Sequence, residues 1–128
     1  MILLAVAVVA IMVLKNNGTS GMTVATAVAK PLPRLLDLGA TKCIPCKMMA
    51  PILEELKKEY AGRMNVEFID VWVNPDAGKQ YGIEMIPTQI FFDASGKELF
   101  RHVGFFAKED ILAKWKELGV ELAAAGAK

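Results

Sequence analysis

Two cysteines three positions apart, Cys43 and Cys46, are the only cysteines in this chain of 128 residues. If Cys43 ends a loop and Cys46 lies in the first turn of the following helix, the two sulfurs can close a small ring. Such a ring opens and closes readily, so the spacing favours thiol–disulfide exchange. A purely structural disulfide is a poorer explanation, because a four-residue loop removes little entropy from the unfolded chain.

Metal binding is the main alternative use of such a pair. A structural zinc site needs four ligands, and the chain has no third cysteine and a single histidine, His102. We therefore expect no metal in this site. A Cu(I)-delivery module using the two thiols is a weaker alternative, because no third soft ligand is evident. The sequence carries no NADPH or flavin motif, so we also expect no cofactor.

The beginning of the chain predicts an attachment to a membrane or export across it. Residues 2–14 are thirteen apolar residues without a charge. A spanning helix needs about 20 residues, and no basic segment precedes this run. We expect residues 1–14 to be a short anchor, slightly favoured, or a signal peptide, followed by a linker at 15–33. Either role places the catalytic domain outside the cytoplasm, on the periplasmic side, where disulfides persist.

Hydrophobic periodicity predicts one domain at residues 34–122, followed by a tail at 123–128. We expect strands at 34–40, 65–73, 88–92 and 98–103, and helices at 45–60, 77–81 and 108–118. This order predicts an α/β fold in which a central mixed β-sheet is flanked by helices on both faces. We expect Trp72 and Trp115 to pack in its core or at its rim, and we expect Met48 and Met49 to fill the core.

The cysteines then lie where the first strand passes into the first long helix. Asp37 lies in that apolar strand, and burial should raise its pKa, which makes it a candidate acid or base for Cys46. Cys43 precedes the helix, whose unsatisfied N–H groups stabilise a thiolate, so it should be the nucleophile. Cys46 should be the resolving thiol, which attacks the mixed disulfide and releases the product.

Several separated motifs resemble those of the thioredoxin family. Cys43-Ile44-Pro45-Cys46-Lys47 matches the family's Cys-x-Pro-Cys-Lys active site, Asp37 matches its buried acid, and Ile86-Pro87-Thr88 matches its cis-proline loop. Further matches are the helix proline Pro51, the pair Asn74-Pro75, the run Tyr81-Gly82-Ile83, and Gly104. The resemblance runs from about Arg34 to Leu118 and implies a thioredoxin-like fold and a thiol–disulfide oxidoreductase. Ile86 and Pro87 would present a backbone edge to an extended client segment.

The chain also departs from the cytoplasmic thioredoxin pattern. Lys42 replaces a tryptophan, Gly39 replaces an aromatic residue, and Phe68 replaces the lysine that partners the buried acid. We therefore expect a specialised, exported protein that reduces disulfides of client proteins and takes electrons from a membrane thiol carrier. No histidine lies between the cysteines, which favours a reductase over an oxidase or isomerase on the same fold. A net charge of +1 gives no reason to expect nucleic acid binding, and we expect a monomer.

Overall fold

The computed structural model describes residues 30–123. The predicted anchor or signal segment at 1–14, most of the linker and nearly all of the tail lie outside the described residues. The elements in chain order are β1 (Arg34–Gly39), α2 (Ile44–Glu59), β2 (Asn65–Asp70), α3 (Pro75–Gln80), β3 (Thr88–Phe92), β4 (Glu98–Val103) and α4 (Lys108–Glu117). Among residues 30–123, none of the helices has the length and apolar character needed to cross a membrane.

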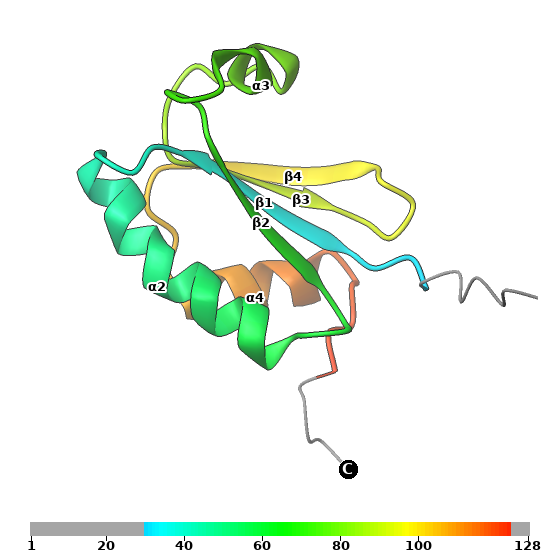
Figure 1. Cartoon of the computed structure of the whole chain (residues 1–128). Coiled ribbons are helices and arrows are strands. Elements are labelled where there is room, and N and C mark those ends of the chain that lie inside the picture. The colour runs from blue at the N-terminus through cyan, green and yellow to red at the C-terminus, as the bar shows by residue number, and fades with distance from the viewer. Residues whose placement is uncertain (1–29, 124–128) are drawn as a thin grey trace, which may run out of the picture.

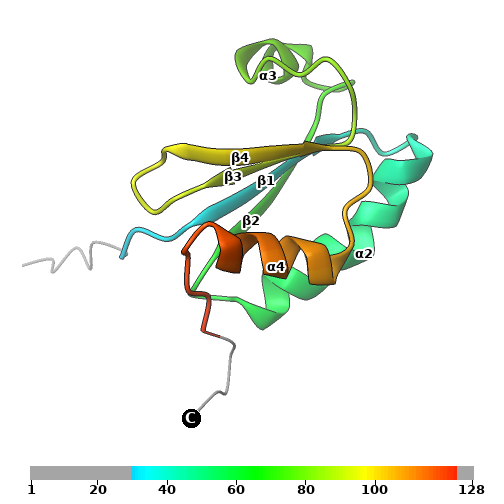
Figure 2. The same cartoon turned by 180° about the vertical axis from the view of Figure 1, so that it is seen from behind.

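The strands form one mixed sheet in the order β2-β1-β3-β4. β1 pairs in parallel with β2, whereas β1 with β3 and β3 with β4 pair antiparallel. Helices α2 and α4 cover one face of the sheet and α3 lies on the opposite side, as Figures 1 and 2 show from two directions. The predicted mixed sheet with helices on both faces is confirmed.

The central strand β1 is buried on both faces, which explains its continuous apolar run. Its Leu35 packs toward α2 and α4 with Met49, Phe91 and Trp115. Its Leu36 and Leu38 pack toward the other face, against side chains of β3 and the segment after α3. Since β1 is covered on all sides, a polar side chain on this strand is placed in the protein interior.

Two predicted boundaries are wrong for reasons that the side chains explain. β2 was expected to reach residue 73 but ends at Asp70, because the Asp70 carboxylate accepts the N–H groups of Trp72 and Val73 and turns the chain. α3 begins at Pro75, two residues earlier than expected, because the Asn74 side chain caps it by accepting the N–H of Ala77. The other element ends agree to within one residue.

Half of the expected large apolar core residues are exposed instead. Trp115 and Met49 are buried as predicted, but the side chains of Trp72 and Met48 are 60% and 51% exposed. Met48 lies in the first turns of α2 and Trp72 lies just after β2, both at the end of the sheet where β1 passes into α2. The fold therefore leaves apolar side chains uncovered at the same end as the cysteine pair.

Candidate active site

The two cysteines form a disulfide at the N-terminus of α2, with their Cα atoms 5.1 Å apart. Cys43 is the N-cap residue, and its Sγ accepts the backbone N–H of Cys46 at 3.3 Å. Pro45 occupies the first helical turn, where its missing N–H costs no hydrogen bond. In the reduced protein, the same N–H groups and the positive end of the helix dipole would stabilise a thiolate on Cys43.

The two sulfur-bearing side chains differ in their access to solvent. Cys43 is partly exposed, whereas Cys46 is only 4% exposed. An incoming disulfide can therefore reach Cys43, and Cys46 can reach only its own partner cysteine or a group bound to it. This difference fits the roles expected for a nucleophile and a resolving thiol.

Gly39, at the end of β1, lets the sheet approach the buried sulfur closely. A Cβ at this position would lie 3.1 Å from Sγ of Cys46 and 3.1 Å from the ring of Phe68. A larger side chain would force one of these neighbours to move. Glycine at position 39 therefore leaves room for Phe68 and Cys46 to pack against β1, where an aromatic side chain would not fit.

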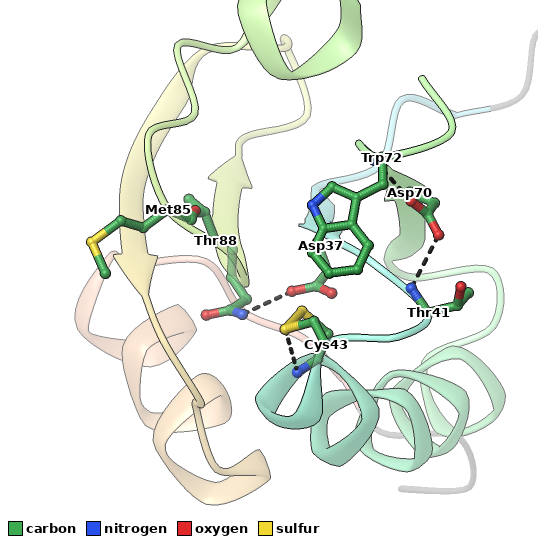
Figure 3. Close-up of a disulfide and its surroundings, with 9 residues drawn as sticks. Asp37, Thr41, Cys43, Asp70, Trp72, Met85 and Thr88 are labelled. Carbon is green, nitrogen blue, oxygen red and sulfur yellow. Dashed lines mark hydrogen bonds between the residues drawn. A yellow bond between two sulfur atoms is a disulfide. The ribbon is translucent and has the colours of Figure 1, made fainter. Parts of the chain in front are cut away.

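Asp37 is completely buried in β1, with 0% of its surface exposed. Its strand neighbours are Phe68 in β2 and Gln89 in β3. The Gln89 side-chain amide donates a hydrogen bond to Oδ1 of Asp37 at 2.7 Å, shown as a dashed line in Figure 3. Burial raises the pKa of Asp37 to about 6, and the hydrogen bond from Gln89 acts in the opposite direction. Asp37 is thus buried and its pKa is raised, and its part as an acid or base for Cys46 stays a prediction.

Gln89 was not identified from the sequence as a site residue. It directly follows the Ile86-Pro87-Thr88 motif, and it lies opposite Asp37 only because β1 and β3 pair in this register. The one signal available in the sequence is an amide inside an otherwise apolar strand. A buried amide of this kind needs a hydrogen-bond partner in the interior.

Asp70 joins the two loops that border the disulfide, and it too was missed by sequence analysis. Its Oδ2 accepts the N–H of Thr41 at 3.0 Å, in the loop that leads to Cys43. Its Oδ1 accepts the N–H groups of Trp72 and Val73. These hydrogen bonds lower the pKa of Asp70, and the bond from the Thr41 N–H has the largest effect. Trp72 belongs to the surroundings of the disulfide in Figure 3, so Asp70 holds both this residue and the cysteine loop in place.

The predicted client-binding residues lie on a third loop beside the site. The Ile86–Pro87 peptide bond is cis, and the Pro87 carbonyl accepts the N–H of Gly104 at 2.8 Å. In the described part of the chain, the backbone N–H and C=O of Ile86 make no backbone hydrogen bond. Pro87 has no N–H and its carbonyl already accepts a hydrogen bond, so of these two residues Ile86 is the one with free backbone groups.

Exposed apolar side chains surround these loops. They come from the helix start, the loop after β2, the segment before Pro87 and the end of β4: Ile44, Met48, Trp72, Val73, Met85, Val103 and Phe105. Trp72, Met85 and Ile86 also line a pocket of about 440 Å³ between α3 and the proline loop. Within residues 30–123, no cluster of three or more histidine, cysteine or acidic side chains could hold a metal ion.

A family model described as "Thioredoxin" matches residues 18–117. The chain belongs to the thioredoxin family. It is 42% identical over 78 residues to proteins described as "Thioredoxin" from Staphylococcus aureus strains Mu50 and MW2, which covers 61% of this chain and 74% of each relative. A solved structure described as "Structure of a malarial protein" has a TM-score of 0.65 and 24% identity, and the match covers 70% of this chain and 99% of that one.

The family model and the relatives confirm the family that the motifs implied. The solved structure supports only the thioredoxin-like fold. Together with the Cys43–Cys46 disulfide, the family model and the relatives make this protein a thiol–disulfide oxidoreductase. The family model covers the whole sheet and all the loops that border the disulfide.

Proposed function

We propose that this thioredoxin-family protein reduces disulfides in client proteins outside the cytoplasm. The observation that carries the proposal is the arrangement at the start of α2, where an accessible sulfur on Cys43 is paired with a buried sulfur on Cys46. Behind them lies Asp37, a carboxyl group with a pKa of about 6. The three groups provide a nucleophile, a resolving thiol and a proton acceptor.

In the reduced protein, the reaction begins at Cys43. Its thiolate attacks one sulfur of the client disulfide, a mixed disulfide forms, and the first client sulfur leaves as a thiolate that takes a proton from water. Cys46 then gives its proton to Asp37, and its thiolate attacks Sγ of Cys43. The Cys43–Cys46 disulfide forms and the second client sulfur leaves, so two electrons have passed from the dithiol to the client.

The surface around the disulfide supports a polypeptide as the substrate. The unpaired backbone groups of Ile86 can hydrogen-bond with an extended client segment, as in the addition of a strand to a sheet edge. Exposed Met85 and Trp72 offer apolar contacts on either side of this loop. Methionine side chains adapt to differently shaped partners, so this surface suits several clients. Nucleic acid is not part of the proposal, because the net charge is only +1.

The proposed location rests on residues 2–14, thirteen consecutive apolar residues. A membrane thiol carrier would return electrons to the Cys43–Cys46 disulfide there, and the protein would act as a monomer. Fusing residues 1–33 to a bacterial phosphatase that is active only outside the cytoplasm tests the location. Activity of the fusion, and its loss when Val8 and Val9 are both changed to aspartate, is the expected result. An inactive fusion would contradict an extracytoplasmic role.

The direction of the reaction is tested by the reduction potential of the full chain. No histidine lies between the cysteines to stabilise the thiolate further, and the exposed Lys42 is screened by solvent and salt. Equilibration with a glutathione redox series should therefore give a potential closer to about −270 mV, the value for thioredoxin, than to about −120 mV, the value for a strong periplasmic oxidant. A potential above about −180 mV would favour an oxidase or isomerase instead.

A further inference from the structure

A pair of polar side chains, Asp37 and Gln89, is enclosed in the interior beside the disulfide. Both are 0% exposed, and they face each other across the antiparallel β1–β3 pairing. Gln89 donates its amide N–H to Oδ1 of Asp37 at 2.7 Å. Within residues 30–123, Oδ2 of Asp37 and Oε1 of Gln89 have no hydrogen-bond partner. Burying a carboxyl and an amide in this way costs free energy, which indicates that the pair has a role in the reaction.

We propose that Gln89 is a positioning residue that holds Oδ1 of Asp37 and so leaves Oδ2 to exchange a proton with Cys46. The inference rests on the proposed function of Asp37 as the proton acceptor in the exchange reaction. Gln89 touches neither the client nor the sulfurs in this scheme, and it acts only through the carboxyl group.

The backbone places Cys46 within reach of Asp37. Gly39 follows Asp37 by two residues on the same face of β1, and the two positions are separated by about 7 Å along the strand. Sγ of Cys46 lies 3.1 Å from the point where a Gly39 Cβ would stand. The carboxyl group extends from the neighbouring position on this face, so the thiol and the carboxyl group adjoin the same stretch of β1, and we take the proton to pass between them.

Few charged or titratable groups face Asp37 from the surrounding elements. The start of α2 contributes its N-cap Cys43 and Cys46. β2 contributes Asp70, whose carboxylate accepts the N–H groups of Thr41, Trp72 and Val73. β4 contributes His102, which lies beyond Gln89 and contacts the Phe105 carbonyl at 3.1 Å. The buried residues of α4 are apolar. Within the described chain, Gln89 is thus the one side chain that donates a hydrogen bond to the Asp37 carboxylate.

This hydrogen bond opposes the effect of burial on the protonation of Asp37. Burial raises the pKa of Asp37 to about 6, and the bond from Gln89 keeps it from rising further. Asp37 is therefore mostly ionised at pH 7 and ready to accept a proton from Cys46. Loss of a hydrogen bond to a charged group corresponds to a rise of about one to two pH units. Without Gln89, about half to nine-tenths of Asp37 would be protonated at pH 7, so fewer molecules could use it as the acceptor.

The first experiment measures the titration of Asp37 in the full, oxidised chain. Gln89→Met keeps the length of the side chain and removes the donor. The carboxyl C=O infrared band, assigned by its loss in Asp37→Asn, should titrate about one pH unit or more higher in Gln89→Met. Gln80→Met, an exposed position at the end of α3, is the matched control and should leave the midpoint unchanged. An unchanged midpoint in Gln89→Met would overturn the inference.

The second experiment follows the exchange reaction itself in the reduced, full chain. The pH profile of single-turnover reduction of a small aromatic disulfide should move upward in Gln89→Met, with a rate at pH 7 about two- to tenfold lower. In an Asp37→Asn background the same change should have less than a twofold effect, because Gln89 acts only through Asp37. A loss in that background as large as in the otherwise unchanged chain would refute the positioning role.

Two precautions keep the result interpretable. Circular dichroism and urea unfolding show whether Gln89→Met folds. If it does not, Gln89→Asn takes its place, because asparagine keeps the amide but its side chain is shorter by one methylene group. The same upward movement of both midpoints is expected, and unchanged midpoints would again refute the inference. Neither readout depends on the direction of electron flow, so a failed reductase proposal would show in the reduction potential and not here.

Discussion

Replacing Asp37 by asparagine should make the oxidised protein more stable at pH 8, although it removes a group assigned to the reaction. The pKa of Asp37 is about 6 in the folded protein, against a reference value of 3.8. Below 3.8 the carboxyl is protonated in both the folded and the unfolded chain, and it carries no penalty. As the pH rises from 3.8 through 6, the unfolded chain loses this proton more readily than the folded protein, so stability is lost, and the loss is complete above pH 6.

The magnitude follows from the difference between the two pKa values. A difference of about 2 pH units corresponds to about 3 kcal/mol of unfolding free energy. Asparagine has the same shape, never ionises and can still accept the N–H of Gln89, so it avoids this loss. Asp37→Asn should therefore gain up to about 3 kcal/mol at pH 8 and close to nothing at pH 4.

Urea unfolding of the disulfide-bonded full chain measures this difference. Working with the oxidised protein keeps the thiols from titrating, and tryptophan fluorescence reports unfolding through the buried Trp115. The midpoint at pH 8 should rise by on the order of 1–3 M urea. Asp110→Asn, at an exposed position in the first turn of α4, is the matched control and should change stability by less than about 0.5 kcal/mol.

The dependence on pH decides whether the reasoning holds. If Asp37→Asn changes stability by the same amount at pH 4 and pH 8, the carboxyl group does not titrate with a raised pKa in the folded protein. If it destabilises the protein at pH 8, the ionised form is stabilised by the fold. Either result would refute the assignment of Asp37 as a buried acid that exchanges a proton near neutral pH.

Two further predictions concern the cysteines. In the reduced protein near neutral pH, Cys43 should be alkylated before Cys46, because it combines exposure with stabilisation of its thiolate at the helix N-terminus. Peptide mass spectrometry identifies the labelled residue. Earlier labelling of Cys46 would reverse the roles of the two cysteines. Gly39→Val should lower the unfolding free energy by about 1–3 kcal/mol, because the valine Cβ would lie 3.1 Å from both Cys46 Sγ and the Phe68 ring. An unchanged urea midpoint would show that these neighbours move aside without loss of stability.

The sequence alone determined the order of the elements and the chemistry of the cysteine pair. Hydrophobic period and turn residues are local signals, so β3 and β4 were predicted with the bounds that the structure has. The spacing of Cys43 and Cys46 is also local, since three residues at the start of a helix bring the two sulfurs together. The run of leucines around it made Asp37 a candidate buried acid, and the resemblance to the thioredoxin family favoured burial over a side chain that points to water.

Local signals failed where a side chain bonds to the backbone of its own turn. Asp70 ends β2 by accepting two N–H groups that would otherwise continue the strand. The apolar, β-forming residues that follow it predicted a longer strand, because propensity does not register this competition. Trp72 was expected in the core or at its rim for a similar reason. Its hydrophobicity is clear from the sequence, but the turn at Asp70 leaves its side chain 60% exposed.

The tertiary structure decided which residues surround the reacting groups. Gln89 is 52 residues from Asp37 in the chain, and the two meet only through the register of β1 against β3. A change of one residue in that register would turn Gln89 to the opposite face of the sheet. Asp70 likewise reaches Thr41 across 29 residues. The pairing of strands depends on the packing of whole sheet faces, which local sequence signals do not contain. The sequence therefore identified the candidate acid and the thiols, whereas the hydrogen-bond partner of the acid is known only from the assembled sheet.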